Sequence, residues 1–144
     1  MYLTGGTAYA GIVVKNGGQL DIAGELGQEV RMSKWSSTGY ITGVRVAFDA
    51  DWDNVSVRHL NIRWGGHIDY IGVGLAASLG LSGADGGVFE YITLEDATGT
   101  FGVQFQDSVT CPNMTNMSLQ APNGVGTECG ATGTGPDCCA AAGL

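Results

Sequence analysis

The sequence of 144 residues is short of charge, and of basic charge above all. Charged residues make up 14% of the chain, against roughly 25% in ordinary globular proteins. Only 6 residues are Lys or Arg, against 14 Asp or Glu. The resulting net charge of −8 repels nucleic-acid phosphates and anionic lipid surfaces. We therefore expect neither nucleic acid nor a membrane among the partners.

Several sequence signals are absent. No apolar run approaches the roughly 18 residues that cross a bilayer, and the segment after Met1 has neither the basic nor the apolar region of a signal peptide. The G-x-S-x-G nucleophile motif and the G-x-x-x-x-G-K phosphate-binding motif are also missing. We expect an extracellular protein or a component of a virion surface, since virion proteins need no signal peptide.

Glycine, in contrast, is abundant and recurs at a regular interval. The chain has 25 Gly, which disfavours helix and favours turns and close backbone contacts. A Gly followed by alternating apolar residues repeats at spacings of 32, 29 and 30, in Gly11-Ile12-Val13-Val14, Gly43-Val44-Arg45-Val46, Gly72-Val73-Gly74-Leu75 and Gly102-Val103-Gln104-Phe105. A degenerate copy starts at Gly124-Val125. Such a period indicates stacked repeats.

A second motif, apolar-x-x-apolar-x-apolar, lies between the copies of the first. It occurs as Val57-x-x-Leu60-x-Ile62, Phe89-x-x-Ile92-x-Leu94 and Met114-x-x-Met117-x-Leu119. Alternation of apolar and polar residues is typical of strands with one buried face. We predict parallel rungs near residues 11–24, 43–64, 72–94 and 102–119, with Leu60, Ile92 and Met117 in one interior column.

Two segments, 12–24 and 53–66, carry a resemblance to a known family. The first is similar to the V-x-x-G-G-x-L-x-I-x-G rung of secreted right-handed parallel β-helix proteins, and the second resembles their N-x-V strand leading into x-I-R-Y-G-G, with Trp64 in place of Tyr. The resemblance to these pectin-lyase-like proteins implies an all-β fold, a short right-handed parallel β-helix (β-solenoid) of about four to five rungs over residues 1–126, followed by an irregular cysteine-containing tail or cap over 127–144. A β-sandwich is the competing fold, and the near-regular period argues against it.

All four cysteines lie in the C-terminal third, at Cys111, Cys129, Cys138 and Cys139. The paired C-x-x-C spacing of a zinc site is missing. We predict at least one disulfide that pins the tail to the last rung. Three pairings are open, and free buried thiols are the alternative.

The outward face of the predicted strands is the candidate binding site. If the apolar residues point inward, their neighbours form outward rows, which are His59-Asn61-Arg63, Tyr91-Thr93-Glu95 and Asn116-Ser118-Gln120. Arg63 would then lie above Glu95, about one strand spacing of 4.8 Å away. This polar, partly aromatic face is like many sugar-contacting surfaces. An ordinary solvent-exposed face with a stacked ion pair is the alternative.

The acidic residues raise two further possibilities, Ca²⁺ binding and glycoside hydrolysis. The alternating Asp49, Asp51 and Asp53 would suit Ca²⁺, but Asn54 and Leu60 occupy the EF-hand positions of Gly and Glu, and a solvated turn is the competing interpretation. We expect no cofactor, with Ca²⁺ as the alternative. For hydrolysis, the outward rows supply only one acid, Glu95, where a pair is needed.

We therefore expect a non-enzymatic surface β-solenoid module, structural or glycan-binding, of the extracellular or tailspike kind. A polysaccharide lyase or glycoside hydrolase of the pectin-lyase-like type and a pure assembly subunit are the alternatives. A polysaccharide or cell-surface glycan is the expected ligand.

The ends of a short stack expose strand edges and apolar side chains, and only ten residues, 1–10, precede the first strand. A homo-oligomer or larger assembly is therefore expected.

Overall fold

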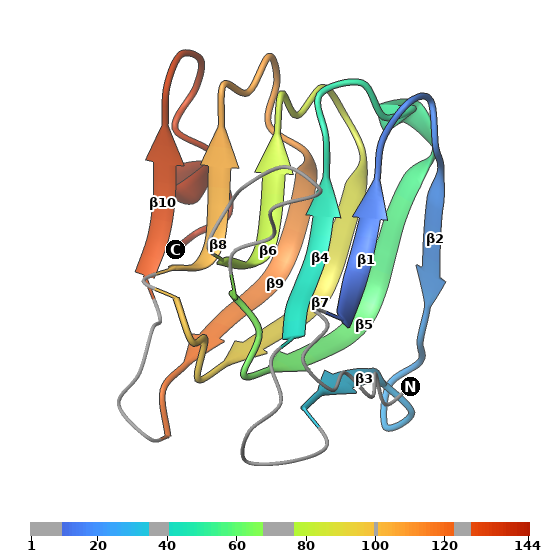
Figure 1. Ribbon diagram of the computed structural model, residues 1–144, viewed down its shortest axis with the longest axis vertical. Helices are drawn as coiled ribbons and strands as arrows, with labels where there is room; N and C mark the ends of the chain where they lie inside the picture. Colours follow the sequence, from blue (N-terminus) through green and yellow to red (C-terminus); the bar gives the residue numbers. More distant parts are fainter. Residues whose placement is uncertain (1–9, 35–40, 68–76, 100, 123–127) are drawn as a thin grey trace.

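A computed structural model of the chain describes residues 10–34, 41–67, 77–99, 101–122 and 128–144. This part of the chain is all-β, with ten strands in two five-stranded sheets (Figure 1). The first sheet has the strand order β1-β4-β6-β8-β10, formed by Ala10–Val14, Ile41–Val46, Ala77–Ser82, Phe101–Gln106 and Glu128–Thr132. The predicted parallel pairing is confirmed for every pair of these strands.

The second sheet lies behind the first in Figure 1. It has the order β2-β5-β7-β9, formed by Leu20–Ala23, Val55–Arg63, Val88–Glu95 and Asn113–Gln120. β3 (Val30–Ser33) pairs with the second half of β5, and β2 pairs with its first half. All pairs are again parallel. From β4 to β10 the chain alternates between the two sheets. β5 is therefore connected to β7 through β6, and β7 is connected to β9 through β8.

The core lies between the sheets and is built from stacked columns of apolar side chains. The predicted column is confirmed, because Leu60 pairs with Ile92 and Ile92 pairs with Met117. Leu60 and Ile92 are fully buried, and Met117 is partly buried against them. The parallel register that aligns this column also places Arg63 beside Glu95, as the sequence predicted.

A corner residue with positive φ interrupts each of the three long strands of the second sheet. The residues are His59, Tyr91 and Asn116, with φ of 50°, 57° and 53°, and the ladder of paired residues skips His59 and Tyr91. The extra residue shifts the inward-outward phase, so that Val57 and Leu60 both point into the core although three positions separate them. This explains the apolar-x-x-apolar-x-apolar spacing as a bend rather than a straight strand.

The resemblance to the pectin-lyase-like β-helix proteins is not supported. The described residues form two separate sheets with open edges, and no closed solenoid is found among them. The repeated glycine motif misled in one place, because Val44 of the second copy pairs with Leu79, which lies six positions beyond Val73, its counterpart in the third copy. That third copy, Gly72-Val73-Gly74-Leu75, and the degenerate copy at Gly124-Val125 lie outside the described residues.

The prediction of an irregular tail is wrong for Glu128–Thr132, which form β10 at the edge of the first sheet. The short helix α1 (Cys138–Ala141) follows, and the Asp137 carboxylate caps it by accepting hydrogen bonds from the N–H groups of Cys139 and Ala140. β10 has no run of large apolar residues, and its Cys129 packs against the core that includes Cys138 and Cys139 of the helix.

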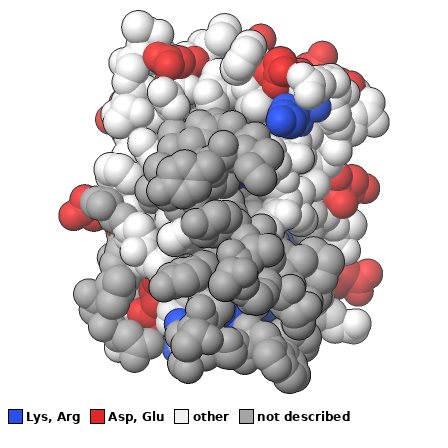
Figure 2. Space-filling view, in the orientation of Figure 1, with Lys and Arg blue, Asp and Glu red and all other residues white. Residues whose placement is uncertain are grey.

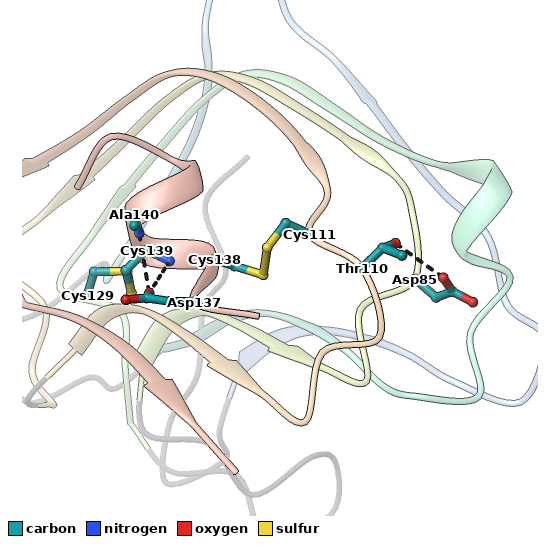
Figure 3. The surroundings of a disulfide bond; sticks show 8 residues. All are labelled: Asp85, Thr110, Cys111, Cys129, Asp137, Cys138, Cys139 and Ala140. Atoms are coloured by element: carbon teal, nitrogen blue, oxygen red, sulfur yellow. Dashed lines mark hydrogen bonds between the residues drawn. A yellow bond between two sulfur atoms is a disulfide. The ribbon is translucent and has the colours of Figure 1, made fainter. Parts of the chain in front are cut away.

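The predicted disulfides are confirmed. Cys111 is bonded to Cys138 and Cys129 to Cys139, and both bonds hold α1 (Figure 3). Such bonds indicate an oxidising, extracellular-type environment. Within the described ranges, no helix has the length and apolar character needed to cross a membrane.

Candidate functional site

The candidate site is the outer face of the second sheet, near the C-terminal ends of β5 and β7. Asn61 pairs with Thr93 and Arg63 with Glu95 in the ladder. The Asn61 amide Nδ2 donates to Glu95 Oε1 at 2.7 Å, and Arg63 Nε lies 3.7 Å from Glu95 Oε2. The parallel register therefore brings four of the six predicted residues, Asn61, Arg63, Thr93 and Glu95, onto one patch.

A second carboxylate and an aromatic ring also hold Arg63. Its Nε lies 3.5 Å from Oδ2 of Asp96, which is 1% exposed, and its guanidinium carbon lies 4.2 Å from the centre of the Trp64 ring. The Lys34 ammonium lies over the same ring at 5.0 Å. The carboxylate contacts are ion pairs outside hydrogen-bond geometry, so Nε has no hydrogen-bond partner among the described residues. The guanidinium is thus fixed by charge and stacking.

A groove of about 330 Å³ opens at this patch, and it is lined by Arg31, Met32, Ser33, Asn61, Arg63 and Glu95. Half of these residues belong to β3, which sequence reasoning missed. The alternation of Val30 and Met32 with polar neighbours was the available signal, but four residues are too few for periodicity to be decisive. β3 extends the polar face by one strand, because Arg31 pairs with Asn61 and Ser33 with Arg63.

The remaining two predicted residues, His59 and Tyr91, form a stacked aromatic pair at the corner of the sheet. Their ring centroids are 4.6 Å apart and the rings are within 2° of parallel. Tyr91 is 48% exposed. Asn116 occupies the corresponding corner of β9. His59 and Tyr91 lie two positions along the chain before Asn61 and Thr93, so an aromatic pair precedes the polar rows on the same two strands.

The two carboxylates of this site, Glu95 and Asp96, share one cationic partner, Arg63. Glycoside hydrolysis uses two carboxyl groups on either side of the scissile bond, separated by about 5 to 9.5 Å. Glu95 and Asp96 instead contact the same Arg63 Nε atom, and Asp96 is buried. The site offers donors, acceptors and an exposed ring, which suit binding.

The structure does not support the Ca²⁺ alternative at Asp49, Asp51 and Asp53. Among the residues that it describes, no group of three or more His, Cys, Asp or Glu side chains is placed to hold a metal. Asp51 Oδ2 instead accepts hydrogen bonds from Gln19 Nε2 at 2.8 Å and Asn54 Nδ2 at 2.9 Å. These two bonds lower the pKa of the Asp51 carboxyl. The segment is a hydrogen-bonded turn that leads through η1 (Trp52–Asn54) into β5.

Comparison with known proteins adds no assignment. No protein-family model matches the sequence, and neither the curated proteins nor the solved structures include a significant match.

Proposed function

We propose that this protein is a non-enzymatic carbohydrate-binding module that works outside the cell or on a virion surface. The groove between β3, β5 and β7 is the proposed binding site for a polysaccharide. The observation that carries the proposal is the Asn61–Glu95–Arg63 network, which opens into a groove. The exposed ring of Tyr91 lies on the same strand as Glu95. An acidic protein with two disulfides is suited to the oxidising setting in which surface glycans occur.

The chemistry of the groove matches that of a sugar. Sugar hydroxyls both donate and accept, and the groove presents a carboxylate acceptor in Glu95 and guanidinium donors in Arg31 and Arg63. Hydrogen bonds to charged groups of this kind are among the stronger ones in water, worth about 1.5–3 kcal/mol. The exposed face of Tyr91 offers the apolar surface on which the C–H face of a sugar ring can stack.

The extent of the polar face favours a chain of sugars over a single one. Four strands, β3, β5, β7 and β9, contribute one outward row each, and the last row ends in Gln120, whose Nε2 donates to Ser118 Oγ at 3.2 Å. At about 4.8 Å between strands, the rows span roughly 14 Å. A linear polysaccharide that crosses the strands would meet a similar polar group at each step.

Calorimetric titration with glycans selected on an array tests this proposal. Glu95→Gln removes the charged acceptor, and we expect binding to weaken about tenfold or more. Glu90→Gln is the matched control, because Glu90 lies on the same strand and pairs with Arg58 at 3.1 Å, but does not line the groove. Its affinity is expected to stay within about twofold of the unmodified protein.

The aromatic contribution is tested separately by Tyr91→Asn. Asn tolerates the left-handed corner conformation, as Asn116 does in the next strand. The variant therefore removes the ring without straining the backbone, and the expected loss is about 2- to 12-fold, the range of one aromatic contact. The proposal fails if no glycan binds, or if Glu95→Gln and Glu90→Gln weaken binding equally.

One observation favours a second candidate, an assembly subunit. β9 pairs only with β7 among the described strands, and its inward residues Met117 and Leu119 are only partly buried. An open edge of this kind can pair with another copy, and we propose a homo-oligomer on this basis. Light scattering across a concentration range tests it, and a mass of 14.8 kDa at every concentration would overturn it.

A further inference from the structure

A second hollow, of about 310 Å³, lies at the other end of the molecule. It is formed by residues that follow β4, β6 and β8, among them Phe48, Trp52, Asp53, Asp85 and Val109. In Figure 1 these strands end at the top, and acidic groups are visible along this upper edge in Figure 2. The glycan groove proposed above adjoins the opposite end, where β5 and β7 finish. The two sites are therefore separate, and this inference does not rest on the proposed glycan binding.

Two large apolar side chains stand exposed at the hollow on a fixed backbone. Phe48 is 74% exposed and Val109 is 65% exposed. The backbone N–H of Val109 donates to the Ala84 carbonyl at 2.8 Å, and Cys111, two residues on, is anchored by its disulfide to α1. Phe48 packs against Gly83, where even a single added carbon would collide with its Cβ. A backbone that is already fixed reduces the conformational entropy lost on binding, which favours association.

Acidic groups surround these side chains. Asp85 Oδ1 accepts a hydrogen bond from Thr110 Oγ1 at 3.2 Å (Figure 3). Neither Asp53 nor Asp85 forms an ion pair with any described residue, and none of the residues lining the hollow is basic. The floor includes Trp52, which is 5% exposed and whose Nε1 has no hydrogen-bond partner in the described chain. An apolar surface with acidic groups at its rim favours a cationic, partly apolar ligand.

We infer that the hollow docks a segment of another protein in which a Lys or Arg stands beside an aliphatic or aromatic side chain. The apolar side chain would pack between Phe48 and Val109, and the cation would pair with Asp53 and Asp85. A second copy of this chain is a poor occupant, because its basic residues already have partners. Lys15 has one, and the other five contact acidic, aromatic or backbone groups, namely Arg31, Lys34, Arg45, Arg58 and Arg63.

The test uses three synthetic peptides and the full chain, with binding followed by fluorescence anisotropy. The peptides alternate Lys with Leu, Glu with Leu, or Lys with Ser. Phe48→Ser and Asp85→Asn change the hollow. Leu26→Ser and Glu25→Gln are the matched controls, since Leu26 is 85% exposed and Glu25 is exposed in the distant turn between β2 and β3. Near-UV circular dichroism verifies that each variant is folded.

We expect the Lys/Leu peptide to bind most tightly. Each hollow variant should weaken its binding by about three- to tenfold, as the loss of one partly exposed apolar or ionic contact would, and each control should stay within about twofold. Equal binding of the Lys/Ser peptide, or equal weakening by Glu25→Gln and Asp85→Asn, would mean general attraction to an acidic protein and would overturn the inference. A dimer that Phe48→Ser dissociates in light scattering would also overturn it, in favour of a second copy.

Discussion

β4 in the first sheet and β7 in the second have different burial patterns. In β7 the inward Phe89, Ile92 and Leu94 are buried, and the outward Thr93 and Glu95 are partly exposed. In β4 every residue is buried. The difference shows that the outer face of β7 meets solvent whereas that of β4 does not, and the polar rows of the candidate site include the outer face of β7.

Arg45 is the residue that marks this contrast most clearly. It occupies an outward position of β4, yet it is 0% exposed. Its guanidinium donates to the carbonyls of Val44 at 3.1 Å and His67 at 3.4 Å. A fully buried cation is rare unless its donors are satisfied. The outer face of β4 at Arg45 therefore has an interior environment.

The largest expected effect compares neighbouring positions in the two strands. Ile92→Ala should lower the free energy of unfolding by about 2–5 kcal/mol because it leaves a core cavity, whereas Thr93→Ala should cost less than about 1 kcal/mol, as partly exposed positions do. In β4, Arg45→Ala should cost about 2–4 kcal/mol, because packing is lost and two buried carbonyls lose a donor. Urea unfolding measures all three. If Arg45→Ala lowered the free energy of unfolding as little as Thr93→Ala does, the proposed difference between the outer faces of β4 and β7 would be wrong.

The next comparison sets the two disulfides against each other. Cys111–Cys138 closes a segment of 27 residues and Cys129–Cys139 one of 10. Chain-entropy arguments give about 3.6 kcal/mol for the longer loop and about 2.7 kcal/mol for the shorter. We expect the double variant Cys111→Ala/Cys138→Ala to lose more thermal stability than Cys129→Ala/Cys139→Ala in calorimetry. The reverse order would show that native packing around α1, and not loop closure, dominates.

A smaller effect separates two glycines with positive φ. Gly43, with φ of 93°, lies in β4 against the Ser78 carbonyl, whereas Gly27, with φ of 80°, has open space around its Cα. Gly27→Ala should cost about 1 kcal/mol, from backbone strain alone. Gly43→Ala adds a steric clash with the backbone of β6 and should cost about 1–2 kcal/mol more. If chemical denaturation gave the same loss of stability for Gly27→Ala and Gly43→Ala, β4 and β6 would move apart at Gly43 at little cost.

The smallest effect concerns two carboxyls whose pKa values are lowered for different reasons. Side-chain hydrogen bonds from Gln19 and then Asn54 lower the pKa of Asp51, whereas the N–H of Glu29 itself is the main group that lowers the pKa of Glu29. We expect Gln19→Leu to raise the pKa of Asp51 toward its usual range and to leave that of Glu29 unchanged. Carboxyl NMR titration measures both.

The sign of the stability effect follows from linkage. A carboxyl with a lower pKa in the folded state contributes stability above its unfolded pKa and loses it as the pH falls through the folded pKa. The stability difference between the unmodified protein and Gln19→Leu should therefore be present at neutral pH and should disappear in acid below the folded pKa of Asp51. A difference that grows in acid would contradict this explanation.

Most strands of the second sheet could be predicted from the sequence, because a strand with one buried face alternates apolar and polar residues. The parallel register of Leu60 with Ile92, and with it the meeting of Arg63 and Glu95, was predictable from the aligned motifs. The corner at His59 was visible only as an unexplained extra residue. The resemblance to a β-helix family and the Ca²⁺ alternative did not survive, since short glycine-rich and acidic patterns have many structural origins.

By itself the sequence determined an acidic, glycine-rich, parallel all-β chain with at least one disulfide and a polar face on β5 and β7. Local composition decides these properties, because strand alternation, turn residues and net charge do not depend on distant partners. Only the tertiary structure decided which cysteines pair and that Glu128–Thr132 form a strand. It also decided that Arg45 is buried and that a hollow lies beside Phe48. Each of these depends on residues that are distant in sequence and meet only when the sheets stack.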